Sequence, residues 1–170
     1  MEIHVIDYLT EKERIDKWNK RAIDDLKLRS KSYQICESPD DIGRFLDQLP
    51  GTTNKVCIHI LSHGNKLGIA KSTNKYFLQV IHYELLLLGI SIVKRRVPHL
   101  YLNFLAVCHS ATIGNFSKRP YSKLWAYSGE TSSIAQSLLI YKEPSYNLAA
   151  IAHLLPEEDN YLQLEGNDND

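Results

Sequence analysis

The sequence predicts an α/β protein with a mostly parallel, five-stranded central sheet covered by helices on both faces as a three-layer sandwich. Short apolar runs of strand length alternate with segments of helical periodicity along the chain, which is the order of elements in a parallel sheet. Residues 99–107 carry apolar side chains on both faces, as a central parallel strand does. The chain of 170 residues is long enough for one domain with its own core.

Five segments are expected to form the sheet. Each is rich in apolar residues and is bounded by turn or capping residues. They are residues 2–8, 32–36, 55–61, 99–107 and 124–127.

Capping signals mark the starts of the first two helices. Thr10 and Glu13 have the spacing of a capping box, and Ser38 is followed by Pro39 at the first helical position. In the first helix a buried stripe is expected from Ile15, Trp18, Ala22 and Leu26. Later helices are expected over residues 81–95, 132–141 and 145–155, and residues 65–75 are expected to form a loop or a small hairpin.

Composition excludes several kinds of partner. Twenty basic and twenty acidic residues leave no net charge, so nothing electrostatic favours nucleic acid. The N-terminus lacks the pattern of a signal peptide, and the longest apolar run is too short to span a bilayer. Three cysteines without clustered spacing indicate a reducing compartment. We therefore expect a cytoplasmic protein that binds neither nucleic acid nor membrane.

Two predicted strands end in reactive residues. His63 and Gly64 follow the strand at residues 55–61, and Cys108 follows the strand at residues 99–107. The carboxyl ends of parallel strands face one crevice, and an imidazole is the usual activator of a thiol nucleophile. The sequence therefore predicts a catalytic pair of His63 and Cys108, with the amides of Gly64 and Cys108 stabilising an oxyanion.

Zinc is the alternative use of these residue types. Cys57, His59, His63 and Cys108 all have side chains that bind zinc. A strand from Cys57 to His63 would rise roughly 20 Å at ~3.3 Å per residue, which is too far for one ion. We therefore expect no metal site and no cofactor.

The two motifs resemble those of one protein family. Ser62-His63-Gly64 and Cys108-His109-Ser110-Ala111 are similar to the motifs of the caspase-like (clan CD) cysteine peptidases, most of all the CHAT and metacaspase branches. His63 precedes Cys108 by 108 − 63 = 45 residues, close to the ~50 typical of caspases. The resemblance covers about residues 1–155, and residues 156–170 are expected to be an acidic C-terminal tail.

The resemblance implies a fold and an activity. The strand order would be 2-1-3-4-5, counted along the chain. The activity would be that of a cysteine endopeptidase, in which the His63–Cys108 dyad hydrolyses peptide bonds of a protein substrate. Stand-alone relatives of this kind often belong to bacterial defence or cell-death modules.

The resemblance also indicates where substrate would bind. Ser62, Ser128 and Glu130 would line the substrate site, and Glu130 is the carboxylate placed to read a basic P1 side chain. Glu130 can equally be a first-turn residue of the following helix. Many metacaspase-like relatives carry Asp two residues before the nucleophile, where this chain has Ala106, so a basic P1 preference would depend on Glu130 alone.

Two other functions remain open at this stage. The first is a catalytically silent caspase-like scaffold that binds a partner protein. The second is a flavodoxin-like ligand-binding domain, which the lack of a glycine-rich phosphate loop disfavours. As an enzyme, the protein would bind a protein or peptide substrate, and so short a core leaves room for an activating partner or a homo-oligomer.

Overall fold

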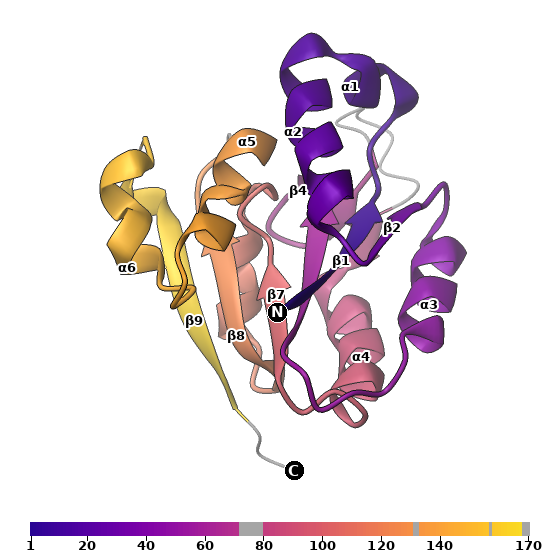
Figure 1. Ribbon diagram of the computed structural model, residues 1–170. Helices are drawn as coiled ribbons and strands as arrows, with labels where there is room; N and C mark the ends of the chain where they lie inside the picture. Colours follow the sequence, from indigo (N-terminus) through magenta and orange to yellow (C-terminus); the bar gives the residue numbers. More distant parts are fainter. Residues whose placement is uncertain (72–79, 131–132, 157, 168–170) are drawn as a thin grey trace.

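The protein is an α/β structure with a mostly parallel central sheet (Figure 1). The computed structural model describes residues 1–71, 80–130, 133–156 and 158–167. The central sheet has six strands in the order β2-β1-β3-β7-β8-β9, and a separate antiparallel sheet has the order β4-β5-β6. The central strands are β1 (Glu2–Asp7), β2 (Ser32–Ile35), β3 (Val56–Leu61), β7 (Leu100–Asn103), β8 (Arg119–Tyr127) and β9 (Tyr161–Asn167). The small sheet contains β4 (His63–Gly64), β5 (Gly68–Ala70) and β6 (Val80–His82).

The predicted α/β class and mostly parallel sheet are confirmed, but the five-stranded sheet of order 2-1-3-4-5 differs from the observed one. The sixth strand, β9, pairs antiparallel with β8 at the edge, within residues 156–170, which were expected to be a tail. Tyr161 is buried, and its ring lies 4.7 Å from that of Tyr127. Gly166 lets the two strands approach, because a Cβ there would lie 1.5 Å from the Tyr121 carbonyl oxygen. The acidic composition of residues 156–170 did not indicate that β9 would pair with β8.

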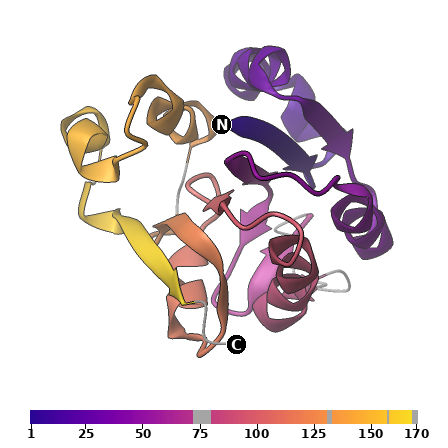
Figure 2. The ribbon, with the colours of Figure 1, turned by 60° about the horizontal axis from the view of Figure 1, so that its bottom comes forward.

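Helices cover both faces of the sheet (Figure 2). One face carries α3 (Pro39–Gln48), α4 (Tyr83–Lys94) and the 3-10 helix η1 (Ser110–Asn115). The other carries α1 (Glu11–Ile15), α2 (Lys17–Arg29), α5 (Ile134–Ser137), η2 (Leu139–Lys142) and α6 (Leu148–Ile151). Short 3-10 turns, η3 (Ala152–Leu154) and η4 (Glu158–Asn160), lead into β9. No helix in the described part of the chain is long and apolar enough to cross a membrane.

The first predicted helix is broken in two. Thr10 and Glu13 form the expected capping box, but Asp16 is extended (φ −55°, ψ 132°) and caps a second helix by accepting a hydrogen bond from the Trp18 amide (3.0 Å). Ala22 and Leu26 are buried as predicted. The prediction for Ile15 and Trp18 is wrong, because they are 68% and 77% exposed. The break at Asp16 takes both off the buried face.

Several later boundaries also differ from the prediction. Residues 132–141 contain α5 and η2 rather than one helix, and residues 145–155 contain only the short α6 and η3. Within residues 65–75, the described part supports a hairpin of β4 and β5, while residues 72–79 lie outside the described residues. The strand expected at residues 124–127 begins earlier, at Arg119, because its first residues pair with β9.

A buried polar network fastens α5 and η2 to the sheet. His59 on β3 is fully buried, and its Nδ1 lies 2.7 Å from the Tyr141 hydroxyl. Its Nε2 lies 3.1 Å from Ser137 Oγ. Asn103 donates to both the Ser137 carbonyl and the Tyr141 hydroxyl (3.1 Å each). Since both ring nitrogens of His59 are engaged in an enclosed site, a protonated imidazole is disfavoured there.

Acid should therefore weaken the fold through His59. Burial lowers the pKa of His59 from 6.5 to about 3, so between these values the unfolded chain binds more protons than the folded one. The free energy of unfolding should fall by about 1 kcal/mol per pH unit from this residue as pH drops from 6 to 4. Urea unfolding of wild type and His59→Gln across this range measures the difference in slope. Parallel pH profiles would contradict the prediction.

Candidate active site

The two predicted reactive segments meet through Gly64. A Cβ placed on Gly64 would lie 2.2 Å from the Cys108 carbonyl oxygen and 2.5 Å from Val107 Cγ1. Only glycine allows this approach, since real Cβ atoms essentially never come within 3.0 Å of such neighbours. His63, which precedes Gly64, is therefore held beside the segment that carries Cys108.

The first segment follows the central strand β3 directly, as predicted, whereas Cys108 does not directly follow β7. His63 and Gly64 form β4 of the small sheet. The prediction that residues 99–107 form one strand is wrong in its second half, because β7 ends at Asn103. The Asn103 side chain accepts a hydrogen bond from the Leu105 amide (3.1 Å), a local bond that competes with continued strand pairing. Cys108 thus lies in a turn beyond the sheet.

Ser110 and His109 shape the turn around Cys108. Ser110 Oγ donates to the Phe104 carbonyl (3.0 Å) and accepts from the Tyr127 amide (2.8 Å), which ties the turn to β8. His109 adopts a left-handed backbone conformation with φ 57°, uncommon for a residue with a side chain. Its amide donates to the Gly129 carbonyl (3.0 Å). The nucleophile candidate is therefore held in a tight, well-braced turn.

Cys108 is the accessible thiol of the three. Cys36 and Cys57 are fully buried, and burial raises the pKa of each to about 12, so both remain neutral. Cys108 is partly exposed, and its Sγ donates to the Glu130 carbonyl oxygen (2.7 Å). A reagent in solution reaches Cys108 before either of the other thiols.

A carboxylate that the sequence did not point to contacts His63. His63 Nε2 forms a hydrogen bond with Glu13 Oε1, and the two side chains are 29% and 27% exposed. Burial raises the pKa of Glu13, but hydrogen bonds from Thr10 and from His63 outweigh it, so the net pKa is lowered. Glu13 is therefore ionised at neutral pH. In the sequence, the capping box with Thr10 accounts for Glu13, and no sequence pattern indicates that Glu13 also contacts His63.

Buried Asp7 at the end of β1 positions Glu13. Asp7 is fully buried and accepts hydrogen bonds from Arg14 Nε (3.1 Å), the Tyr33 hydroxyl (2.6 Å) and the Leu9 amide (3.0 Å). Arg14 is the neighbour of Glu13 on α1, and it also donates to the Leu9 carbonyl (2.6 Å). These bonds fix α1 over the carboxyl end of the sheet, where His63 lies.

The other three predicted site residues, Ser62, Ser128 and Glu130, differ in their exposure and in their hydrogen bonds. Ser62 is buried, and its hydroxyl donates to the His63 carbonyl (2.8 Å). Ser128 is exposed and donates to the Asn160 carbonyl (3.3 Å). Glu130 is exposed and contacts Cys108 through its backbone. Ser128 and Glu130 thus have accessible side chains, whereas Ser62 supports the backbone of His63.

Tyr83, at the start of α4, is a second residue that no sequence pattern indicated as a candidate for the site. Its side chain is fully buried, and its hydroxyl has no hydrogen-bond partner among the described residues. Burial raises the pKa of Tyr83, and the neighbouring Cys108 raises it further. Tyr83 is therefore a neutral phenol.

The described residues include no cluster of three or more His, Cys, Asp or Glu side chains that could hold a metal ion. Cys57 Sγ instead lies 3.4 Å from the Tyr141 hydroxyl, in the buried network of His59. His63 instead pairs with Glu13, which is not part of that network. Of the four residues weighed for zinc, Cys57 and His59 share the Tyr141 hydroxyl, whereas His63 contacts Glu13 and Cys108 contacts the Glu130 carbonyl.

Comparison with known proteins adds no assignment: no protein-family model matches the sequence, and a search of curated proteins gives no match.

Gly64 offers a direct test of how the two segments meet. Gly64→Ala should lower the free energy of unfolding by about 1–3 kcal/mol, because the methyl group overlaps backbone atoms of Cys108. It should also change the rate at which iodoacetamide alkylates Cys108, measured by mass spectrometry. Gly43→Ala is the matched control, since a Cβ there meets nothing within 4 Å and alanine favours the helix by about 1 kcal/mol. Equal unfolding curves for the two variants would contradict the contact.

Proposed function

We propose that the protein is a cysteine endopeptidase of caspase-like type, with Cys108 as nucleophile and His63 as general base and acid. The observation that carries the proposal is the packing of Gly64, the residue after His63, against the backbone of Cys108, whose thiol is accessible. The mostly parallel sheet with helices on both faces supports it. The motifs Ser62-His63-Gly64 and Cys108-His109-Ser110-Ala111 support it further.

The chemistry follows from these groups. Cys108 Sγ transfers its proton to His63 and attacks the substrate carbonyl carbon, giving a tetrahedral oxyanion. Amides of Gly64 and Cys108 would stabilise that oxyanion. The imidazolium then protonates the leaving amine, which leaves a thioester on Cys108. His63 next takes a proton from water, which attacks the thioester, releases the acid and restores the thiol.

Glu13 gives His63 its orientation in this scheme. A carboxylate bound to Nε2 favours the neutral tautomer with its proton on Nε2, so that Nδ1 is the nitrogen that accepts the thiol proton. The negative charge of Glu13 also stabilises the imidazolium formed during the reaction. Glu13 acts as a positioning residue, since it contacts His63 and not the substrate.

Glu130 suggests how substrate binding and activation are linked. In the resting structure the Cys108 thiol donates to the Glu130 carbonyl (2.7 Å), so this bond must break before the proton passes to His63. A substrate seated here lies next to the exposed Glu130 carboxylate, which favours a basic P1 side chain. The substrate would be a polypeptide, and a cytoplasmic bacterial defence or cell-death module is the setting that the family resemblance suggests.

Labelling of the native protein tests the dyad. Acyloxymethyl-ketone peptides with Arg, Leu or Asp at P1 should modify Cys108 selectively, and mass spectrometry should find Cys36 and Cys57 unmodified. His63→Ala should slow the labelling at least ~100-fold, as loss of a general base does. Glu130→Gln should reduce the advantage of the Arg probe over the Leu probe. Labelling of Cys108 at the same rate in wild type and His63→Ala would refute the dyad.

The role of Glu13 has its own prediction. Glu13→Gln should slow Cys108 labelling by about 10-fold or more, because the imidazolium loses its carboxylate. Glu11→Gln removes the other carboxylate from the first turn of α1, at an exposed position, so it controls for destabilisation of α1. If both variants slowed the labelling of Cys108 equally, at equal stability, Glu13 would contribute only to the stability of α1 and not through its contact with His63.

The hydrogen bond from Cys108 to Glu130 favours one alternative. It engages the thiol proton with a backbone carbonyl oxygen, which suits a catalytically silent caspase-like scaffold that binds a partner protein. In that case Cys108 would resist every peptide probe even though small alkylating reagents reach it.

A further inference from the structure

The outward face of α4 is unusually apolar. Leu85, Leu88 and Ile92 are 63%, 62% and 43% exposed, although α4 buries its opposite face fully in the core. At ~100° per residue these three side chains fall on one side of the helix. Single exposed leucines are ordinary, but an aligned stripe of large aliphatic side chains on one helix is typical of an interaction surface.

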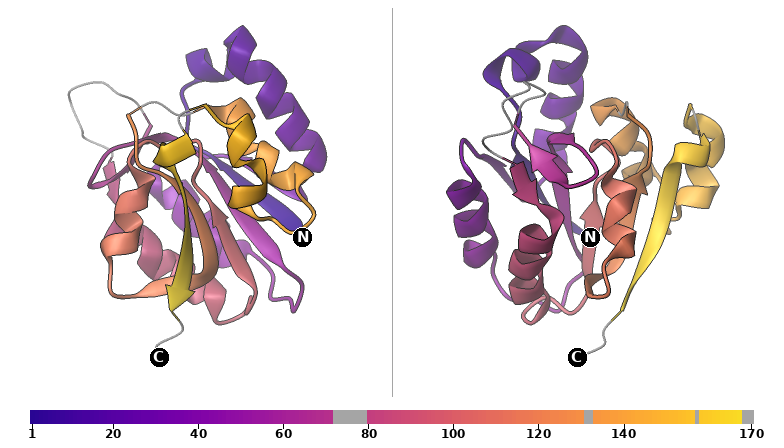
Figure 3. Two further views of the ribbon diagram at one scale, coloured as in Figure 1. Left: turned by 90° about the vertical axis from the view of Figure 1, so that its left-hand side faces the viewer. Right: turned by 180° about the vertical axis from the view of Figure 1, so that it is seen from behind.

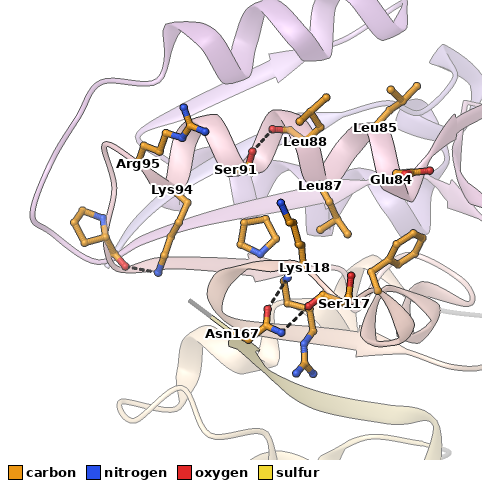
Figure 4. Close-up of a pocket in the computed structure, with 14 residues that line it drawn as sticks. Glu84, Leu85, Leu87, Leu88, Ser91, Lys94, Arg95, Ser117, Lys118 and Asn167 are labelled. Carbon is orange, nitrogen blue, oxygen red and sulfur yellow. Dashed lines mark hydrogen bonds between the residues drawn. The ribbon is translucent and has the colours of Figure 1, made fainter. Parts of the chain in front are cut away.

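The stripe borders a groove. A cavity of about 950 Å³ lies between α4 and the segment of residues 116–120 that leads into β8. Figure 3, in its right-hand view, shows α4 beside this part of the chain. In the close-up of Figure 4, Leu87 points from α4 into the groove and Lys118 extends toward α4 from the opposite wall. Phe116 and Pro120 also line the groove, whereas Leu85 and Leu88 point from α4 to the side opposite Leu87 in this view.

The same face of α4 carries opposite charges at its two ends. Glu84 lies in the first turn, and Arg95 caps the last. Both are exposed, and neither makes an ion pair within the part of the chain that the structure describes. Lys94 is different, because it donates to the Pro98 carbonyl (2.7 Å). By helical spacing, Glu84 and Arg95 fall on the side of the helix that carries Leu88.

We propose that the protein forms a two-fold symmetric dimer in which the α4 helices of two copies pack antiparallel. Antiparallel packing sets Glu84 of each copy against Arg95 of the partner subunit, at both ends of the contact. The two residues are about 16 Å apart along the helix, at ~1.5 Å per residue. An interface that pairs with itself in this way is what a two-fold axis requires.

The residues between these charges fit the same arrangement. With Glu84 opposite the partner's Arg95, Leu88 falls opposite Ser91 of the partner subunit. The Ser91 side chain is small and is bonded back to the Leu88 carbonyl (2.6 Å), so it leaves room for a leucine. Leu85 and Ile92 then extend the apolar contact on either side. In this arrangement the second copy covers the apolar stripe, and no unpaired charge lies at the centre of the contact. Interface cores are usually depleted of charged residues in the same way.

Sedimentation velocity over a range of protein concentrations tests the dimer. Wild type should shift from monomer to dimer as concentration rises. Leu88→Glu should raise the dissociation constant at least ~10-fold, because it places a carboxylate at the centre of the contact. Leu28→Glu is the matched control, since Leu28 is 87% exposed on α2 and should leave the dimer unchanged. A wild type that stays monomeric, or a dimer that withstands Leu88→Glu, would overturn the proposal.

Charge reversal tests the antiparallel register. Glu84→Lys and Arg95→Glu should each weaken the homodimer, because each places like charges together at both ends. An equimolar mixture of the two variants should recover dimer. In the mixed dimer, the charge introduced at position 84 of one copy lies opposite the reversed charge introduced at position 95 of the other copy. The two unchanged residues form the original pair of opposite charges. Circular dichroism checks that both variants are folded. Failure of the mixture to recover would refute this register. The inference is independent of the proposed protease activity, so loss of either leaves the other standing.

Discussion

The buried carboxylate of Asp7 is the interaction on which the arrangement of the candidate site depends. It accepts hydrogen bonds from the Leu9 amide, the Tyr33 hydroxyl and Arg14 Nε, and so joins β1, β2 and α1 at one end of the sheet. A charge taken fully out of water is tolerated only when such partners surround it. Arg14 and Glu13 are neighbours on α1. The hydrogen bond between Arg14 and Asp7 therefore also holds Glu13 next to His63.

The candidate active site lies above the sheet rather than in it. His63 belongs to a two-residue strand of the small sheet, and Cys108 belongs to a turn after β7. A parallel sheet supplies a rigid platform, but its own backbone groups are used in strand pairing. Reactive side chains that must meet a substrate are therefore best carried on short segments beyond it. Here those segments are fixed by one glycine contact and by the hydrogen bonds of Ser110.

Local signals in the sequence were reliable where one short stretch decides the structure. The capping box at Thr10 and the N-cap at Ser38 are present as predicted, because a cap needs only neighbouring residues. The break at Asp16, the end of β7 at Asn103 and the strand at Tyr161 were missed. In each case a competing partner decided the outcome: the aspartate capped a second helix, the asparagine bonded its own backbone, and the C-terminal segment paired with β8.

The sequence by itself determined the α/β class, the starts of α1 and α3 and the two motifs that carry His63 and Cys108, because periodicity and capping depend on adjacent residues. Only the tertiary structure decided that Glu13 contacts His63, that Cys108 contacts Glu130, and that Leu85 and Leu88 of α4 face outward. These facts depend on groups far apart in the chain, such as the 50 positions that separate Glu13 from His63. No pattern within either segment encodes such a contact, because it exists only once the sheet has brought the segments together.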